Sequence, residues 1–153
     1  MGYAFLVAAP ERALLLECGV VDVRASTTAA ERLLAISKAL DVLIRRHRPF
    51  VLAVERLYFN KNVQTAMSVS EARGIALLCG ARAALEIAEY TPQEVKMSVT
   101  GNGRADKKAV QRMLPLLVAL DAPITQDNVA DAVAIALTHA QRARFAEAVA
   151  AAT

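Results

Sequence analysis

The sequence contains few of the residues that build covalent cross-links or thiolate and imidazole metal centres. Its 153 residues include two cysteines, Cys18 and Cys79, and two histidines, His47 and His139. The cysteines lie far apart in apolar segments, which favours small buried side chains over a disulfide or a metal pair. The histidines have charged or helical neighbours and no ligand-like spacing. A disulfide framework and a Cys/His metal centre are therefore not expected.

Long apolar segments are also missing. No apolar run is long enough to cross a bilayer, and the amino-terminal residues lack the pattern of a secretory signal peptide. We therefore expect a cytoplasmic protein without a membrane partner. The hydrophobic fraction of 56% is too high for a disordered chain. The length predicts one domain over residues 1–153, and the net charge of +3 is compatible with a polyanionic partner without requiring one.

The spacing of apolar residues predicts a chain that mixes strands and helices. Strands are expected at about residues 3–9, 13–23, 50–56 and 86–90, the first two as an antiparallel hairpin. Helices are expected at about residues 28–48 and 63–84, and from about residues 92, 107 and 127, the last continuing past His139 and fraying toward Thr153. A hairpin followed by alternating strands and helices predicts an α/β fold with a mixed sheet flanked by helices.

Local signals refine three of these helices. Thr28 and Glu31 have the spacing of a capping box at the start of the first helix. Gly74 and Gly80 lie inside the second helix, where each costs about 1 kcal/mol relative to alanine. A close approach of that helix to the sheet or to another helix would explain them. Pro115 is expected to interrupt or end the helix that starts near residue 107.

Residues 51–62 are the stretch around which the chain is organised. The apolar run Val51–Val54 predicts a strand buried on both faces, and Glu55 follows at its carboxyl end. Catalytic and ligand-binding groups gather at such ends in open α/β sheets. The next residues suit base stacking and phosphate contacts, because they are aromatic, amide and basic: Tyr58, Phe59, Asn60, Lys61 and Asn62. The equally weighted alternative is a solvated glutamate followed by an exposed loop.

A second carboxylate lies in the last helix. Asp131 has apolar neighbours in sequence, and burying an unpaired carboxylate costs several kcal/mol, so a partner or a metal is expected. Asn128, three residues earlier, shares its helical face. Glu55 and Asp131 together suggest a divalent-cation site, for which carboxylate oxygens favour Mg²⁺. Because two such ions assist displacement at phosphorus, these residues indicate hydrolysis of a nucleic-acid phosphodiester.

The loop at residues 101–107 adds a weaker signal of the same kind. It combines glycines with basic residues and opens a helix, an arrangement that suits a phosphate. Its spacing fits neither a Walker loop nor a dinucleotide-binding fingerprint. A solvated turn is the alternative interpretation.

Several motifs in a fixed order resemble those of one family. They are ERLYFNKN at residues 55–62, SEARG at 70–74, EVK at 94–96, TGNGRADK at 100–107 and ADAVAIALTH at 130–139. From Gly2 to about His139 the chain resembles the RuvC family of Holliday junction resolvases. The resemblance implies a ribonuclease H-like fold, a homodimer, and paired Mg²⁺-dependent nicks in four-way DNA junctions during recombination and repair. The implied protein partners are RuvA and RuvB, the branch-migration proteins.

The resemblance also implies roles for individual residues. Glu55 and Asp131 match the metal-binding acids of the family, and Lys96 and Lys107 match basic residues near the scissile phosphate. The catalytic set is therefore expected to be Glu55, Asp131 and Lys107. Tyr58 matches an aromatic residue near the junction centre. Further DNA contacts are expected from side chains for which solvated surface is the alternative: Phe59, Lys61, Arg73 and Arg104.

Two departures from the family pattern bear on activity. The sequence shows no strand ending in an aspartate before Gly2-Tyr3, so the first metal-binding acid is missing and the sheet should have an empty position beside the strand that ends at Glu55. Asn128 stands where the family commonly has an aspartate and sometimes a histidine, and its amide oxygen can ligate a cation but brings no charge. The chain as written is therefore expected to be inactive. The alternative function is a junction-binding homologue that does not cut, and a third candidate is an interaction module without a nucleic-acid role.

Overall fold

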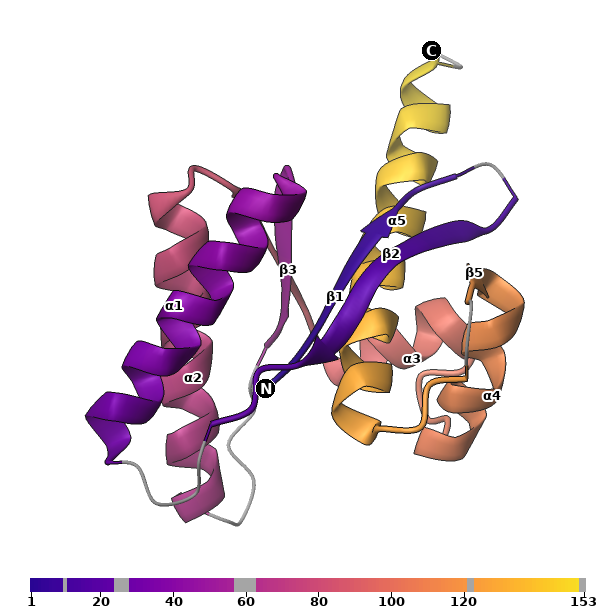
Figure 1. The fold of residues 1–153 in the computed structure, drawn as a ribbon. Coiled ribbons are helices and arrows are strands. Elements are labelled where there is room, and N and C mark those ends of the chain that lie inside the picture. Colours follow the sequence, from indigo (N-terminus) through magenta and orange to yellow (C-terminus); the bar gives the residue numbers. More distant parts are fainter. Residues whose placement is uncertain (10, 24–27, 57–62, 121–122, 152–153) are drawn as a thin grey trace. The chain divides into compact units, whose positions relative to one another are not determined.

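The computed structural model describes residues 1–9, 11–23, 28–56, 63–120 and 123–151 (Figure 1). These residues form two compact units. The first unit contains Met1 and Val21–Glu89, and the second contains Gly2–Val20 and Tyr90–Thr153. Tyr58, Phe59 and Lys61, three of the expected DNA contacts, lie outside the described residues. Among the helices within the described ranges, none combines the length and apolar character needed to span a membrane.

The first unit pairs two helices with a two-stranded sheet. Its elements are α1 (Ala29–His47), β3 (Val51–Glu55), α2 (Val63–Arg82) and β4 (Glu86–Tyr90), and β3 pairs with β4. Helices α1 and α2 pack against each other, as Figure 1 shows. Their interface buries Ile36, Leu40 and Cys79, so Cys79 is the small buried side chain that its sequence context indicated.

The ends of α1 follow the sequence closely. The Thr28 side chain accepts a hydrogen bond from the Glu31 amide, and the Glu31 carboxylate accepts one from the Thr28 amide, which confirms the capping box. The helix ends at Arg48, which adopts the left-handed conformation with φ 45°. Arg45, Arg46 and His47 fill the last turn, where positive charge is favourable.

The two glycines inside α2 have different surroundings. A Cβ atom at Gly80 would lie 2.7 Å from a methyl group of Leu52 and 2.9 Å from one of Ile87, so α2 approaches β3 and β4 closely there. A Cβ atom at Gly74 would meet no atom of the described residues within 4 Å. The predicted close approach is therefore confirmed for Gly80 and wrong for Gly74.

The second unit builds a three-stranded mixed sheet in the order β1-β2-β5. Strand β1 (Gly2–Val7) is antiparallel to β2 (Ala13–Val20), with a register shift between Phe5 and Leu6, and β5 (Val118–Ala119) is parallel to β2. Helix α5 (Asp127–Ala151) packs on β1 and β2, and α3 (Pro92–Thr100) and α4 (Lys107–Leu117) pack on α5. Leu114, Val118 and Val133 are fully buried in this core.

Several predicted features of the elements were wrong. Strand β5 was not predicted, because its two residues are too few for a periodic signal. Helix α4 passes through Pro115 and ends two residues later, at Leu117, so Pro115 lies inside the helix instead of ending it. The prediction that the last helix continues past His139 is confirmed, since α5 ends at Ala151, and the fraying expected toward Thr153 concerns residues outside the described ranges. Strand β3 is buried only at Val54, not on both faces.

The described strands form two separate sheets. Strand β1 pairs with β2, and β3 pairs with β4, while no pairing between β1 and β3 is present among the described residues. The empty position expected in the sheet beside the strand that ends at Glu55 stays a prediction.

Candidate functional site

The carboxyl end of β3 is held by an arginine from α2. Glu55 is the last residue of β3 and its side chain is exposed. The Nε–H group of Arg73 donates a hydrogen bond to the main-chain oxygen of Glu55 at 3.0 Å. The Nη2 group of Arg73 forms an ion pair with the carboxylate of Glu89 on β4. Arg73, expected from the sequence to contact DNA, thus joins α2 to both strands of its own unit.

The first turns of α5 carry the polar residues of the second unit. Asp127, Asn128 and Asp131 are exposed, whereas Val129, Ala130 and the following Val133 and Ala134 are buried. The sequence interpretation placed Asp131 in buried apolar surroundings, and this was wrong, since its side chain is 55% exposed. Its apolar sequence neighbours point to the opposite face of the helix. Asp131 and Asn128, three residues apart, do share one face as expected.

Lys107 supplies the partner that Asp131 was expected to have. Its Nζ atom lies 3.1 Å from Oδ2 of Asp131 and 3.3 Å from Oδ2 of Asp127. The side chain of Gln111, one turn further along α4, donates a hydrogen bond of 2.9 Å to Oδ1 of Asp127. The start of α4 and the start of α5 are therefore linked by one cation shared between two carboxylates.

The pKa values of Lys107 and Asp127 reflect the ion pairs that Lys107 forms with the two carboxylates. Burial alone would lower the pKa of Lys107, but the hydrogen bonds and negative charges of Asp131 and Asp127 raise it overall. The hydrogen bond from Gln111 and the contact with Lys107 lower the pKa of Asp127. The lysine is therefore firmly charged and Asp127 firmly ionised at neutral pH.

A glycine in β1 allows the sheet to approach the same end of α5. A Cβ atom built on Gly2 would lie 1.9 Å from the main-chain oxygen of Asn128 and 2.5 Å from its carbonyl carbon. No side chain fits in that space without moving the backbone of one element. Gly2 thus sets how closely the polar turn of α5 lies against β1.

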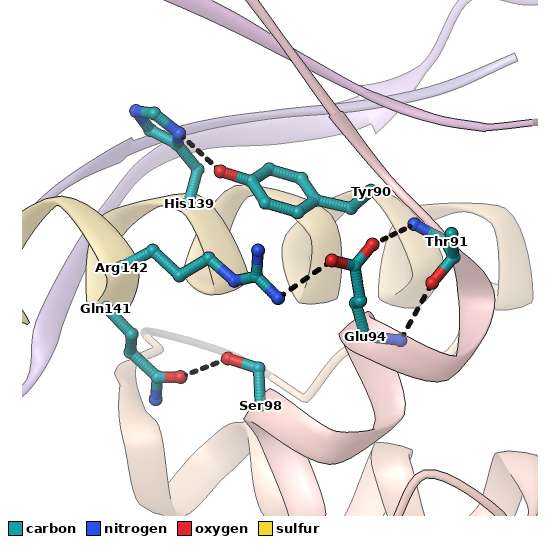
Figure 2. Close-up of polar contacts among 7 residues, drawn as sticks. All are labelled: Tyr90, Thr91, Glu94, Ser98, His139, Gln141 and Arg142. Carbon is teal, nitrogen blue, oxygen red and sulfur yellow. Dashed lines mark hydrogen bonds and ion pairs between the residues drawn. The ribbon is translucent and has the colours of Figure 1, made fainter.

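A polar network fixes α3 to α5 further along (Figure 2). The hydroxyl of Tyr90 is hydrogen-bonded to Nδ1 of His139 at 2.8 Å, and the guanidinium of Arg142 lies 5.1 Å from the centre of the Tyr90 ring. Arg142 also pairs with Glu94 at 3.0 Å. Glu94 completes a capping box with Thr91, and the hydrogen bonds of this box are the main reason that the pKa of Glu94 is lowered.

This network orients the helix that carries Lys96. Ser98 adds a hydrogen bond to Gln141 between the same helices, and Lys96 lies half-buried on α3. The sequence interpretation missed the network. Thr91 and Glu94 have capping-box spacing, which was a readable signal, but nothing in the sequence links Tyr90 to His139 or Arg142.

The loop between α3 and α4 is organised by its own side chains. Gly101 ends α3 in the left-handed conformation with φ 73°, and the Asn102 side chain accepts a hydrogen bond from the Arg104 amide. The carboxylate of Asp106 caps α4 by accepting a hydrogen bond of 2.7 Å from the Ala109 amide. A carboxylate thus already occupies the helix terminus that the sequence suggested for a phosphate. Arg104 is exposed.

The residues expected to hold a metal ion are divided between the two units. Glu55 belongs to the first, and Asp131, Asn128 and Lys107 belong to the second. Their convergence on one cation therefore stays a prediction. Within the described ranges, no group of three or more His, Cys, Asp or Glu side chains is placed to hold a metal ion.

The chemistry of the second unit nevertheless fits a cation. Asp131 and Asn128 present hard oxygen atoms on one exposed helix face, which suits Mg²⁺. The ammonium group of Lys107 lies against Asp131 and shows that this face attracts positive charge. Two oxygen donors are fewer than a divalent cation needs, so further ligands would have to complete its coordination.

Comparison with known proteins identifies the family. The family model described as "Crossover junction endodeoxyribonuclease RuvC" matches residues 1–139. The chain belongs to the RuvC family. A RuvC from Pelotomaculum thermopropionicum is 44% identical over 139 residues, which cover 91% of this chain and 85% of that protein. A RuvC from Alkaliphilus oremlandii is 40% identical over 147 residues, which cover 96% of this chain and 90% of that protein.

Two solved structures extend the RuvC comparison to the fold. The structure of Thermus thermophilus RuvC matches with a TM-score of 0.85 at 31% identity, covering 95% of this chain and 89% of that one. T. thermophilus RuvC in complex with a Holliday junction substrate matches with a TM-score of 0.84 at 30% identity, covering 95% of this chain and 96% of that one. The fold is therefore ribonuclease H-like, as expected. RuvC proteins are metal-dependent, DNA-binding nucleases that resolve Holliday junctions in recombination and repair, and this chain is one of that family.

Proposed function

We propose that this protein binds four-way DNA junctions and resolves them by paired, Mg²⁺-dependent nicks. The observation that carries the proposal is the exposed face of α5, where Asp131 and Asn128 lie beside the ammonium group of Lys107. Such a face offers oxygen ligands for a cation together with a positive charge for a phosphate. Family membership and the similarity to a RuvC structure with a Holliday junction support the choice of substrate.

In this proposal Glu55, Asp131 and Asn128 hold the metal, and Glu55, Asp131 and Lys107 are the catalytic residues. A Mg²⁺ ion held by these residues would supply positive charge at the scissile phosphate and would lower the pKa of a bound water molecule. Lys107 adds a fixed positive charge next to the same phosphate, where developing negative charge is stabilised. The DNA is contacted by residues of three segments: Tyr58, Phe59, Lys61, Lys96 and Arg104.

The same proposal includes the protein's assembly and place of action. A four-way junction has paired strands of equivalent geometry, so two symmetric cuts require two equivalent sites, which a homodimer provides. RuvA and RuvB are the proposed protein partners. The substrate is chromosomal DNA, so the proposed location is the cytoplasm.

The test is a nicking assay on a four-way junction with each strand labelled, performed on the full-length protein. Asp131→Asn should abolish Mg²⁺-dependent nicking and leave junction binding intact, because it removes a charged metal ligand without removing a phosphate contact. Thermal unfolding of the variant checks that it is folded. Near-normal nicking by Asp131→Asn would show that the assigned metal role is wrong.

Junction recognition is tested separately from cutting. The wild-type protein in EDTA should bind a four-way junction more tightly than a linear duplex of equal length, and its affinity should fall steeply with salt, because phosphate contacts release counterions. Equal affinity for both DNAs at every salt concentration would contradict the proposed specificity.

A second candidate function is junction binding without cleavage, and the neutral side chain of Asn128 favours it. Because an amide oxygen brings no charge to the metal, Asn128→Asp distinguishes the two functions. If the protein cleaves junctions, the wild-type protein should already nick them, and Asn128→Asp should reach the same nicking rate at a lower Mg²⁺ concentration. A pure binder should show no nicking until Asn128 is replaced.

A further inference from the structure

Arg73 contacts the strand end that carries Glu55 instead of presenting an unpaired charge to solvent. Its Nε–H group donates to the main-chain oxygen of Glu55 at 3.0 Å, and its Nη2 group pairs with Glu89 on the neighbouring strand. From this geometry we infer that Arg73 is a positioning residue. It fixes the carboxyl end of β3 and thereby the direction in which the Glu55 side chain points, and it is not primarily a DNA contact.

The guanidinium group is suited to this task because it is planar and donates from more than one nitrogen. Its Nε–H group reaches the Glu55 oxygen at the end of β3, and its Nη2 group reaches Glu89 on β4. A rigid fork between two strands restricts both the position and the twist of the strand end. A lysine ammonium is a point charge on a flexible stem and cannot hold two acceptors in a fixed relative orientation.

The surroundings of Arg73 argue against a primary role in DNA binding. Its side chain is only 24% exposed, and its positive charge is already balanced by Glu89. A phosphate would have to displace Glu89, and the electrostatic gain from an already paired cation is small. We call the contacts of Arg73 with Glu55 and Glu89 the clamp on β3. The expected DNA contact thus has weaker support than this clamp.

The clamp matters because the position of a metal ligand is critical. Displacing a catalytic group by about 1 Å lowers rates by about 100-fold. Glu55 is the last residue of β3, and Arg73 holds its main-chain oxygen from α2. This inference rests on the proposed role of Glu55 as a metal ligand.

The chain contains a matched control for this ion pair. Arg32 of α1 pairs with Glu71 of α2 at 2.7 Å, with side chains 34% and 38% exposed, against 24% and 36% for Arg73 and Glu89. Both pairs attach α2 to a neighbouring element by an arginine and a glutamate. Because Glu71 pairs with Arg32 of α1, Glu71→Ala removes a comparable ion pair while leaving the contacts of Arg73 with Glu55 and Glu89 in place.

The experiment compares Arg73→Lys, Glu89→Ala, Glu71→Ala and Glu55→Gln in the full-length protein. Three quantities are measured: Mn²⁺ binding without DNA by electron paramagnetic resonance, junction affinity in EDTA, and single-turnover nicking at saturating junction. Arg73→Lys and Glu89→Ala should weaken Mn²⁺ binding and slow nicking by about 10-fold to 100-fold. Junction affinity should stay at the wild-type value. Glu71→Ala should change neither Mn²⁺ binding nor nicking, even if it lowers the melting temperature.

The two roles of Arg73 predict opposite results for Glu89→Ala. If Arg73 acts by contacting DNA, removing Glu89 frees its charge, so junction binding tightens and nicking is preserved. If Arg73 acts by positioning Glu55, removing Glu89 loosens the clamp, so nicking falls although the net charge becomes more positive. Tighter junction binding with unchanged nicking would overturn the inference, as would wild-type Mn²⁺ binding and nicking by Arg73→Lys.

Failure of the proposed function gives a different pattern. If Glu55→Gln binds Mn²⁺ and nicks as wild type, Glu55 is not a ligand, and both the proposed metal role and the inference fall. If Glu55→Gln weakens Mn²⁺ binding and Arg73→Lys does not, the metal role stands and the inference alone falls. Since Glu89→Ala leaves Arg73 in place, it still tests the clamp if Arg73→Lys does not fold.

Discussion

The ammonium group of Lys107 lies 3.1 Å from a carboxylate oxygen of Asp131. Both residues belong to the proposed catalytic set, yet in the described structure each neutralises the other. A divalent cation on Asp131 would therefore have to compete with Lys107. The second contact of Lys107, at 3.3 Å to Asp127, offers the lysine an alternative partner from the same helix when a cation occupies Asp131.

We expect Lys107→Met to separate metal binding from chemistry. Removing the competing ammonium should tighten Mn²⁺ binding to the protein, because Asp131 is then unpaired. Removing a fixed positive charge beside the phosphate should slow nicking by about 100-fold to 1,000-fold. Electron paramagnetic resonance of Mn²⁺ and single-turnover nicking at saturating metal measure the two effects.

Lys108→Met is the matched control for this variant. Lys108 is the next residue of α4, is exposed, and carries the same charge. It should leave both measurements at their wild-type values. Weaker Mn²⁺ binding by Lys107→Met would show that the lysine helps the cation to bind instead of competing with it.

Much of the fold could be predicted from local signals. The capping box of Thr28 and Glu31 and the helical spacing that follows it needed only residues close in sequence. The exposure of Asp131 could not be predicted in this way. Alanines fill much of α5, and a small apolar side chain is compatible with either a buried or a half-buried face.

The candidate site depended on contacts between residues distant in sequence. The pairing of Arg73 with Glu89 spans 16 residues, and that of Lys107 with Asp131 spans 24. The sequence does not show which residue pairs with a given charged side chain. Arg73 was therefore interpreted as a DNA contact or a solvated surface charge. The motifs predicted a set of site residues, and the structure adds the contacts of Arg73, Lys107 and Asp131.

Gly2 should tolerate no side chain, because its missing Cβ is what lets β1 approach Asn128. A Cβ atom there would lie 1.9 Å from the Asn128 main-chain oxygen. Gly2→Ala is expected to lower the free energy of unfolding by about 1–3 kcal/mol, as overpacking does in other cores. It should also slow nicking, because the turn of α5 with Asn128 and Asp131 must shift. Urea unfolding and the nicking assay measure these effects.

Gly74→Ala should change the free energy of unfolding in the direction opposite to Gly2→Ala. Its added methyl group meets no atom of the described residues within 4 Å, and alanine is favoured over glycine in a helix interior by about 1 kcal/mol. The variant should therefore be more stable than wild type. Equal destabilisation by both substitutions would show that the close approach at Gly2 is not what limits that position.

Tyr90→Phe should weaken the attachment of α3 to α5 while keeping the aromatic ring. The substitution removes the hydrogen bond to Nδ1 of His139, which contributes about 1 kcal/mol in a typical case. Because Arg142 still contacts the ring, Tyr90→Leu should lose about a further 0.5–1 kcal/mol. Urea unfolding of both variants measures the two steps. Identical stability of Tyr90→Phe and wild type would show that water replaces the His139 hydrogen bond fully.

The capping glutamate of α3 should make stability depend on pH in the acid range. Hydrogen bonds from Thr91 and the contact with Arg142 lower the pKa of Glu94 below its ordinary value of 4.5. A carboxyl group with a lowered pKa in the folded state contributes its stabilisation above that ordinary value. The contribution is lost as pH falls through the lowered pKa, because the folded protein must then take up a proton that the unfolded chain already carries.

Glu94→Gln should therefore have a lower free energy of unfolding near neutral pH. Below the ordinary glutamate pKa of 4.5, its free energy of unfolding should fall less steeply with decreasing pH than that of wild type. The side chain is 36% exposed, so solvent screens the Arg142 pair, and we expect that pair to contribute about 0.2–1 kcal/mol. Urea unfolding across the acid range measures the slope. Glu147→Gln, at an exposed position late in α5, should keep the wild-type slope. If Glu94→Gln also keeps that slope, the cap and the Arg142 pair do not hold the pKa of Glu94 down in solution.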